Sequence, residues 1–181
     1  MKATLVFEDE SGFSLVAPLK RTWARRGQTP VMRTQIGHHE RLNLLGALSV
    51  LPSGKNIRLS IRSFWHSLTG MEVITFLKQI LRRIPGTILL LWDRHPIHKR
   101  KIVQEFLVHN PRLLMEYFPV GAPELNPMEF AWSQVSESTA GSAPYDRTDL
   151  QRNVFTGVAR TRRSSNRLQA CLRGTHLDWT S

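Results

Sequence analysis

A continuous apolar run at residues 87–92 (TILLLW) constrains the fold of this chain more than any other segment. A strand with apolar side chains on both faces belongs inside a sheet that is covered on both sides. Amphipathic helical patterns flank the run, and in the first of them Thr69 and Glu72 form a capping box. The alternation of helix and strand around residues 87–92 therefore predicts an α/β fold.

The remaining segments extend this order to three strands, helix, strand, helix, strand, helix. Before the first helix, an antiparallel meander is predicted from three segments, residues 3–7, 41–51 and 56–61. A further apolar stretch at residues 13–18 belongs to the same region. After the run come a helix ending near residue 110, a strand at 113–118 and a helix opened by Asn126 and Pro127. We predict a main domain over residues 1–137, and over 138–181 a linker with a basic C-terminal helical tail.

Charge and cysteine content narrow the functional classes. The 181 residues carry a formal net charge of +11, which favours polyanionic partners and fast, salt-sensitive association. Cys171 is the single cysteine, so a disulfide within the chain and a cysteine zinc cluster are both excluded. The N-terminus lacks the apolar region of a signal peptide, and no apolar run approaches ~18 residues, so we expect a cytoplasmic setting.

The first candidate site residue is Asp9, which follows the first predicted strand. Strand alternation places Glu8 and Glu10 on one face and Asp9 on the other, together with Leu5 and Phe7. A carboxylate that continues an apolar face is costly to bury unless a cation or hydrogen bonds meet it. The pattern alone leaves two readings open: a ligand-binding acid or a solvated strand end.

The second candidate is Asp93, directly after the apolar run. In open α/β sheets, ligands gather at the carboxyl ends of the strands. Lys99, Arg100 and Lys101 follow in what we expect to be the first turn of a helix, where cations oppose the helix dipole. A polyanion would compensate for that cost, so we favour a surface that faces phosphates over a merely solvated basic cluster.

Glu129 is the third candidate acid. With Asn126 as N-cap and Pro127 at the first helical position, Glu129 falls at N3, where an acid also stabilises the helix start. Capping and metal binding are therefore both compatible with this position. His95 and His98 are spaced as a metal pair could be, but histidines of this kind more often bond locally or face phosphate, and we assign His98 to the phosphate-facing surface.

Three carboxylates that converge on one spot suit two hard divalent cations, which prefer oxygen ligands. Two such ions activate a water or a 3′-hydroxyl for in-line attack on a phosphodiester and stabilise the leaving oxygen. The Arg-rich tail and several other basic residues are candidates for binding the nucleic acid: Lys20, Arg21, Arg25, Arg26, His98, Lys99, Arg100 and Lys101.

Five segments resemble a known family. They are residues 8–13 (EDESGF), 21–30 (RTWARRGQTP), 92–98 (WDRHPIH), 117–119 (YFP) and 123–132 (PELNPMEFAW). In this order they are similar to the DDE-type transposases of bacterial insertion sequences related to mariner, over about residues 3–137. Two features depart from the family: Arg94 stands where many relatives have Asn, and the chain begins at the first catalytic strand, without the helix-turn-helix region of full-length relatives.

The resemblance implies a ribonuclease-H-like fold, a mixed five-stranded sheet flanked by helices, with a short C-terminal helical extension. It implies that Asp9, Asp93 and Glu129 are the metal-binding catalytic acids and that two Mg²⁺ or Mn²⁺ ions are the cofactors. The implied activity is cleavage of DNA at element ends and strand transfer into target DNA. The implied partners are terminal inverted repeats, target DNA, a second copy of the chain in a homodimer or higher assembly, and an upstream helix-turn-helix product.

Two alternatives remain open at the level of sequence. A catalytically silent DNA-binding remnant would keep the fold and the charge, and the missing end-recognition region favours it. A stand-alone ribonuclease-H-like nuclease would cleave branched DNA or RNA–DNA hybrids without joining ends. The intact acids favour the transposase. We expect the protein in the bacterial cytoplasm, associated with the nucleoid.

Overall fold

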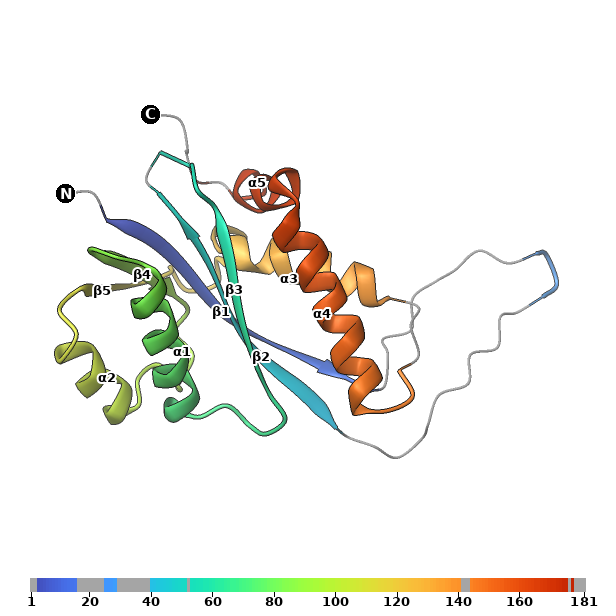
Figure 1. The fold of residues 1–181 in the computed structure, drawn as a ribbon, viewed down its shortest axis with the longest axis horizontal. Helices are drawn as coiled ribbons and strands as arrows, with labels where there is room; N and C mark the ends of the chain where they lie inside the picture. Colours follow the sequence, from blue (N-terminus) through green and yellow to red (C-terminus); the bar gives the residue numbers. More distant parts are fainter. Residues whose placement is uncertain are drawn as a thin grey trace.

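The computed structural model describes residues 3–15, 25–28, 40–51, 53–140, 144–175 and 177. Its centre is a five-stranded sheet in the order β3-β2-β1-β4-β5 (Figure 1). The strands are β1 (Thr4–Ser14), β2 (Arg41–Val50), β3 (Arg58–Phe64), β4 (Ile88–Trp92) and β5 (Leu113–Tyr117). Strands β1, β2 and β3 pair antiparallel, whereas β4 pairs parallel with both β1 and β5. The predicted meander and the mixed sheet are confirmed.

The helices divide between the two faces of the sheet (Figure 1). Helices α1 (Gly70–Arg83) and α2 (Lys101–Val108) cover one face. The other face carries α3 (Pro127–Thr139), α4 (Arg147–Arg163) and α5 (Ser165–Arg173), and a short 3-10 turn, η1 (Pro123–Leu125), precedes α3. No helix among the described residues is long and apolar enough to cross a membrane.

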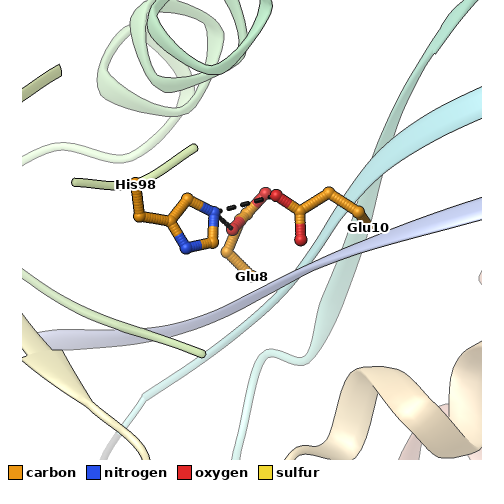
Figure 2. A group of neighbouring side chains, drawn as sticks. All are labelled: Glu8, Glu10 and His98. Carbon is orange, nitrogen blue, oxygen red and sulfur yellow. Dashed lines mark hydrogen bonds and ion pairs between the residues drawn. The ribbon is translucent and has the colours of Figure 1, made fainter. Parts of the chain in front are cut away.

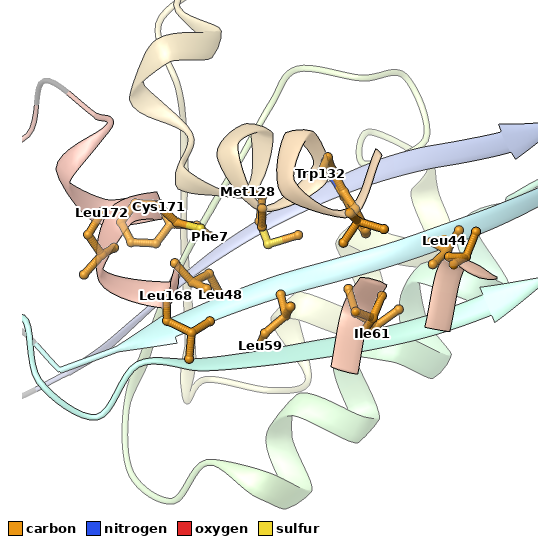
Figure 3. Close-up of a cluster of buried hydrophobic side chains, with 14 of the residues drawn as sticks. Phe7, Leu44, Leu48, Leu59, Ile61, Met128, Trp132, Leu168, Cys171 and Leu172 are labelled. Atoms are coloured by element: carbon orange, nitrogen blue, oxygen red, sulfur yellow. The ribbon is translucent and has the colours of Figure 1, made fainter. Parts of the chain in front are cut away.

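The face under α3 to α5 holds a core in which sheet and C-terminal helices interlock. Figure 3 shows Phe7 and Leu48 of the sheet beside Met128 of α3 and Leu168 and Cys171 of α5. The predicted division after residue 137 stays a prediction. What the structure adds is that α4 and α5 share a hydrophobic core with the sheet, because their apolar stripes pack on it.

Local sequence explains most element ends. The predicted capping box is present at the start of α1: Thr69 Oγ1 accepts from the Met71 N–H at 3.2 Å, and the Thr69 N–H donates to Glu72 at 2.8 Å. The apolar run forms β4, with Ile88, Leu90 and Trp92 fully buried against the α1 and α2 side. Its other face is only partly buried.

Two predicted boundaries differ from the structure. The stretch at 13–18 is not a separate strand as far as it is described, because β1 continues through Ser14 in register with β2. Lys99 and Arg100 do not lie in the first turn of α2, which begins at Lys101. Backbone turns at residues 95–100 occupy that space, with the His98 N–H donating to the His95 carbonyl at 3.1 Å. Only Lys101 opposes the helix dipole there.

Candidate active site

Strand β1 carries the first acid, and its pleat decides where that acid points. Asp9 lies on the face of α3, while Glu8 and Glu10 lie on the face of α1 and α2, as alternation predicts. On the α3 face the indole N–H of Trp132 donates to Asp9 Oδ2 at 3.1 Å. Asp9 is therefore held on a central strand with one carboxylate oxygen already bonded.

Asp93 follows β4, at the carboxyl end of the strand that runs parallel to β1. The His95 N–H donates to Asp93 Oδ1 at 2.8 Å, and His98 Nδ1 lies 3.2 Å from the same oxygen. The hydrogen bond from His98 and the one from the His95 backbone hold the pKa of Asp93 below its ordinary value. With its side chain 50% exposed, Asp93 is ionised and open to solvent.

Glu129 stands at N3 of α3, as predicted from Asn126 and Pro127. Asn126 Oδ1 accepts from the Met128 N–H at 3.0 Å, which caps the helix, and Asn126 Nδ2 donates to the Glu8 carbonyl at 3.3 Å. One buried amide thus ties the start of α3 to β1. This contact places the exposed Glu129 carboxylate at the cavity that Asp9 also lines.

The three acids line one cavity of about 310 Å³. Side-chain oxygens of Asp9, Glu10 and Asp93 lie within 4.8 Å of one another. Burial raises the pKa of Asp9 to about 8, and the negative charges of Glu129, Glu8 and Glu10 add to this rise. Within the described residues, no cationic side chain forms an ion pair with Asp9 or Glu129. The cavity therefore holds negative charge that a divalent cation with oxygen ligands would compensate.

On the other side of β1, the acids meet a buried histidine. Figure 2 shows Glu8 and Glu10 pointing at the imidazole of His98, whose Nε2 lies 2.9 Å from Glu10 Oε1 and 3.3 Å from Glu8 Oε2. Burial lowers the pKa of His98, but contacts with Asp93, Glu10 and Glu8 outweigh it and raise the pKa to about 12. Burial, with Glu10 nearby, raises the pKa of Glu8 to about 7.

The assignment of His98 to a phosphate-facing surface does not fit its position. Its side chain is fully buried, so a DNA phosphate has no access to it. The phosphate-facing role was inferred because histidines of this kind often face phosphate, but residues 95–100 form turns that direct the imidazole inward beneath β1. The imidazole points inward because it contacts the buried carboxylate of Glu8. No sequence pattern identifies Glu8 as a buried charge.

The other predicted nucleic-acid-binding residues lie at the surface where they are described. Arg25 and Arg26 are exposed, as are Lys99, Arg100 and Lys101. Lys20 and Arg21 lie outside the described residues. Arg94 lines the cavity of the acids, with its guanidinium carbon 5.3 Å from the centroid of the Tyr117 ring.

Sequence reasoning missed three residues of this site: Glu10, Asn126 as a link to β1, and Trp132. Trp132 is buried under α3, and its indole N–H is also a hydrogen-bond donor. The sequence did contain a signal for Trp132. Residues three apart on a helix share a face, and Trp132 lies three residues after the candidate acid Glu129.

Comparisons with known proteins show the family and the fold of this chain. Residues 4–151 match the family described as DDE superfamily endonuclease. The insertion element IS630 uncharacterized 39 kDa protein of Shigella sonnei is 31% identical over 132 residues, which cover 73% of this chain and 37% of that protein. This chain thus spans little more than a third of that relative.

Solved structures share the fold at low sequence identity. The Mos1 transposase paired-end complex with left transposon end has a TM-score of 0.65 at 15% identity, over 95% of this chain and 51% of that one. The catalytic domain of Mos1 mariner transposase scores 0.54 at 12% identity, over 96% and 84%. The catalytic core domain of BIV integrase scores 0.50 at 11% identity, over 74% and 83%. The fold is ribonuclease-H-like, and with its family match over residues 4–151 this chain belongs to the DDE superfamily endonucleases.

Proposed function

We propose that this chain is the catalytic region of an insertion-sequence transposase, which cleaves DNA at element ends and transfers the 3′ ends to target DNA. The observation that carries this proposal is the convergence of Asp9, Asp93 and Glu129, from β1, β4 and α3, on one open cavity. Carboxylates far apart in sequence meet there, and among the described residues neither Asp9 nor Glu129 forms an ion pair with a cationic side chain.

Asp9, Asp93 and Glu129 are the residues that would hold two Mg²⁺ or Mn²⁺ ions. The donor set fits, because it consists of carboxylate oxygens, and burial together with the nearby charge of Glu129 raises the pKa of Asp9 to about 8. Bound divalent cations supply Lewis-acid activation of a water or 3′-hydroxyl and stabilisation of the leaving oxygen. Mos1 complexes have been solved with Mn and with Mg, which supports the same ions here.

The chain's own residues hold these acids in place. Trp132 leaves one oxygen of Asp9 free for a ligand by bonding the other, and the His95 N–H restrains Asp93 from the strand end. Asn126 keeps the first turn of α3 against β1. Positioning of this kind is most of what a protein contributes to phosphodiester chemistry at a metal site.

The proposed partner is DNA, both as terminal inverted repeats and as target. The exposed Arg25, Arg26, Lys99, Arg100 and Lys101 would contact its phosphates, together with Lys20 and Arg21. We further propose a homodimer or higher assembly on DNA, completed by an upstream helix-turn-helix product that recognises element ends. This chain would act in the bacterial cytoplasm, associated with the nucleoid.

The decisive experiment measures Mn²⁺-dependent nicking of DNA that carries the neighbouring terminal inverted repeats. Wild type is compared with Asp93→Ala and Glu129→Ala, with and without the product of the upstream reading frame. Glu124→Ala is the matched control, because Glu124 is an exposed acid five residues from Glu129 that does not line the cavity.

Nicking that both cavity variants lose and Glu124→Ala retains would support the acid triad. Dependence on the upstream product would support a split transposase. Cleavage of branched DNA or RNA–DNA hybrids without joining would point to the stand-alone nuclease instead. A folded protein that binds DNA but nicks under neither condition would leave the silent remnant.

A further inference from the structure

The imidazole of His98 is fixed from several directions beneath the acid cavity. It stacks on the Trp92 ring with centroids 4.1 Å apart and planes 8° from parallel. The side chain of Gln104 in α2 donates to the His98 carbonyl at 2.7 Å, which holds the backbone of this turn. The side chain has no exposed surface. His98 is therefore an ordered part of the interior.

Each ring nitrogen of His98 faces oxygen atoms of a different segment. Nδ1 lies 3.2 Å from the Asp93 carbonyl and 3.2 Å from Asp93 Oδ1. Nε2 lies 2.9 Å from Glu10 Oε1 and 3.3 Å from Glu8 Oε2. Because only acceptors surround both nitrogens, both must donate, and the ring is an imidazolium. His98 thus bridges the loop after β4 to the two residues that flank Asp9 on β1.

Neutralising Glu8 explains only half of this arrangement. Glu8 is 1% exposed, and among the described residues neither of its carboxylate oxygens accepts a hydrogen bond, so it needs a positive neighbour. That need would be met by Nε2 alone. The contact of Nδ1 with Asp93 lies on the opposite side of the ring and restrains an acid whose side chain is half exposed.

We propose that His98 is a positioning residue for the divalent-cation site: through Nδ1 it orients Asp93, and through Nε2 it anchors that orientation to β1 beside Asp9. This inference rests on the proposed function, because it assumes that Asp93 binds the cation. Replacing a group that hydrogen-bonds to a metal ligand and orients it typically lowers metal affinity about 10–100-fold. His98 stands in that relation to Asp93.

Two uncharged variants separate the two contacts. The amide of Asn overlaps the position of Nδ1, so His98→Asn keeps a donor toward Asp93. The longer Gln reaches the position of Nε2, so His98→Gln keeps a donor toward Glu10 and Glu8 but loses the one toward Asp93. Both lose the charge, so a role limited to neutralising Glu8 predicts that Gln serves at least as well as Asn.

The test is direct binding of Mn²⁺ to the metal-free full chain, followed by the loss of the free Mn²⁺ signal in electron paramagnetic resonance. Thermal unfolding and inverted-repeat nicking are measured on the same samples. We expect His98→Gln to weaken Mn²⁺ binding about tenfold or more, and His98→Asn to stay within about threefold of wild type. His109→Gln, at the exposed end of α2, should leave Mn²⁺ binding unchanged.

The inference is overturned if His98→Gln binds Mn²⁺ like wild type, or if His98→Asn binds it more weakly than His98→Gln. Failure of the proposed function looks different, because wild type itself would then neither bind Mn²⁺ in the cavity nor nick DNA, and both ideas would fall. If either variant does not fold, the pair is built on Glu8→Leu, which removes the buried carboxylate left unpaired. The same order of affinities is expected there, and the reverse order overturns the inference.

Discussion

Successive acids of β1 lie in opposite environments on the two faces of the sheet. On the α1 and α2 side, Glu8 and Glu10 meet His98 in the interior, where a cation of the chain itself balances them (Figure 2). On the α3 side, Asp9 faces a solvent-open cavity with Glu129 and Asp93, and among described residues Trp132 is its side-chain hydrogen-bond donor. The difference teaches that acidity alone does not mark a ligand site. Glu8 and Glu10 have a counter-charge within the chain, whereas among the described residues Asp9 and Glu129 have none and await a cation. Asp93 lies between the two cases, because it contacts His98 and also lines the cavity.

The largest expected effect is the loss of nicking activity when an acid of the cavity is replaced. Asp9→Asn removes a charged oxygen ligand, and we expect nicking to fall at least about 10³-fold, since bound cations supply several kcal/mol to this chemistry. The thermal midpoint of the metal-free protein should hold or rise, because the cost of burying the Asp9 charge and its repulsion with Glu129 are both removed. Glu137→Gln, an exposed acid on α3, is the control. Equal activity of Asp9→Asn and wild type would remove Asp9 from the site.

Changes to the ion-paired residues Glu8 and His98 should alter mainly the free energy of unfolding. His98→Leu leaves Glu8 and Glu10 without their counter-charge, and removing one partner of a buried ion pair costs about 3–5 kcal/mol. Glu8→Leu removes a buried carboxylate that lacks hydrogen-bond donors, so we expect a change below about 1 kcal/mol or a gain. Urea unfolding of both variants measures this contrast. A loss from Glu8→Leu as large as that from His98→Leu would contradict the comparison.

A third change acts on the contact between β2 and α3. Gly46 pairs with Asp9 across the strands, and a Cβ there would lie 2.5 Å from the side chains of both Met128 and Trp132. We expect Gly46→Ala to cost about 1–3 kcal/mol by overpacking. It should also weaken nicking more than stability predicts, because α3 carries Glu129. Gly86→Ala, whose strain comes from its positive φ rather than from close neighbours, is the comparison variant.

The smallest effect, counted per pH unit, is the pH dependence of stability when a chelator keeps the protein free of metal. The pKa of Asp9 is raised to about 8, so between its ordinary value and about 8 the folded state holds a proton that the unfolded state has released. Stability is therefore lost as pH rises through this window, by at most roughly 1.4 kcal/mol per pH unit from this group. His98, with its raised pKa, adds a slope of the same sign above about pH 6.5.

The difference between wild type and Asp9→Asn isolates the contribution of Asp9. We expect the thermal midpoint of wild type to fall more steeply than that of Asp9→Asn from about pH 6 to about pH 8, by roughly 2–4 °C per kcal/mol. Adding Mg²⁺ should flatten the wild-type slope, since the cation binds the ionised carboxylate. Parallel slopes for the two proteins would mean that Asp9 titrates normally.

Local chemistry made much of this fold predictable. The capping box of Thr69 and Glu72, the N-cap at Asn126 and the apolar run before Asp93 each depend on neighbours a few residues away, and each prediction is confirmed. Strand alternation likewise predicted the opposite directions of Asp9 and its neighbours. The start of α2 was misplaced, because turns at residues 95–100 serve a buried contact of His98 that no local pattern encodes.

What the sequence by itself determined is therefore the order of elements, the α/β class and the positions at which the three acids stand on them. Only the tertiary structure decided which acids are compensated. Glu8 and His98 are 90 residues apart, and the contact that pairs their charges exists only once β1 and the loop after β4 are packed together. Burial and charge pairing are properties of the folded surroundings, so the same carboxyl group can be a buried partner or a cation ligand one residue further along the strand.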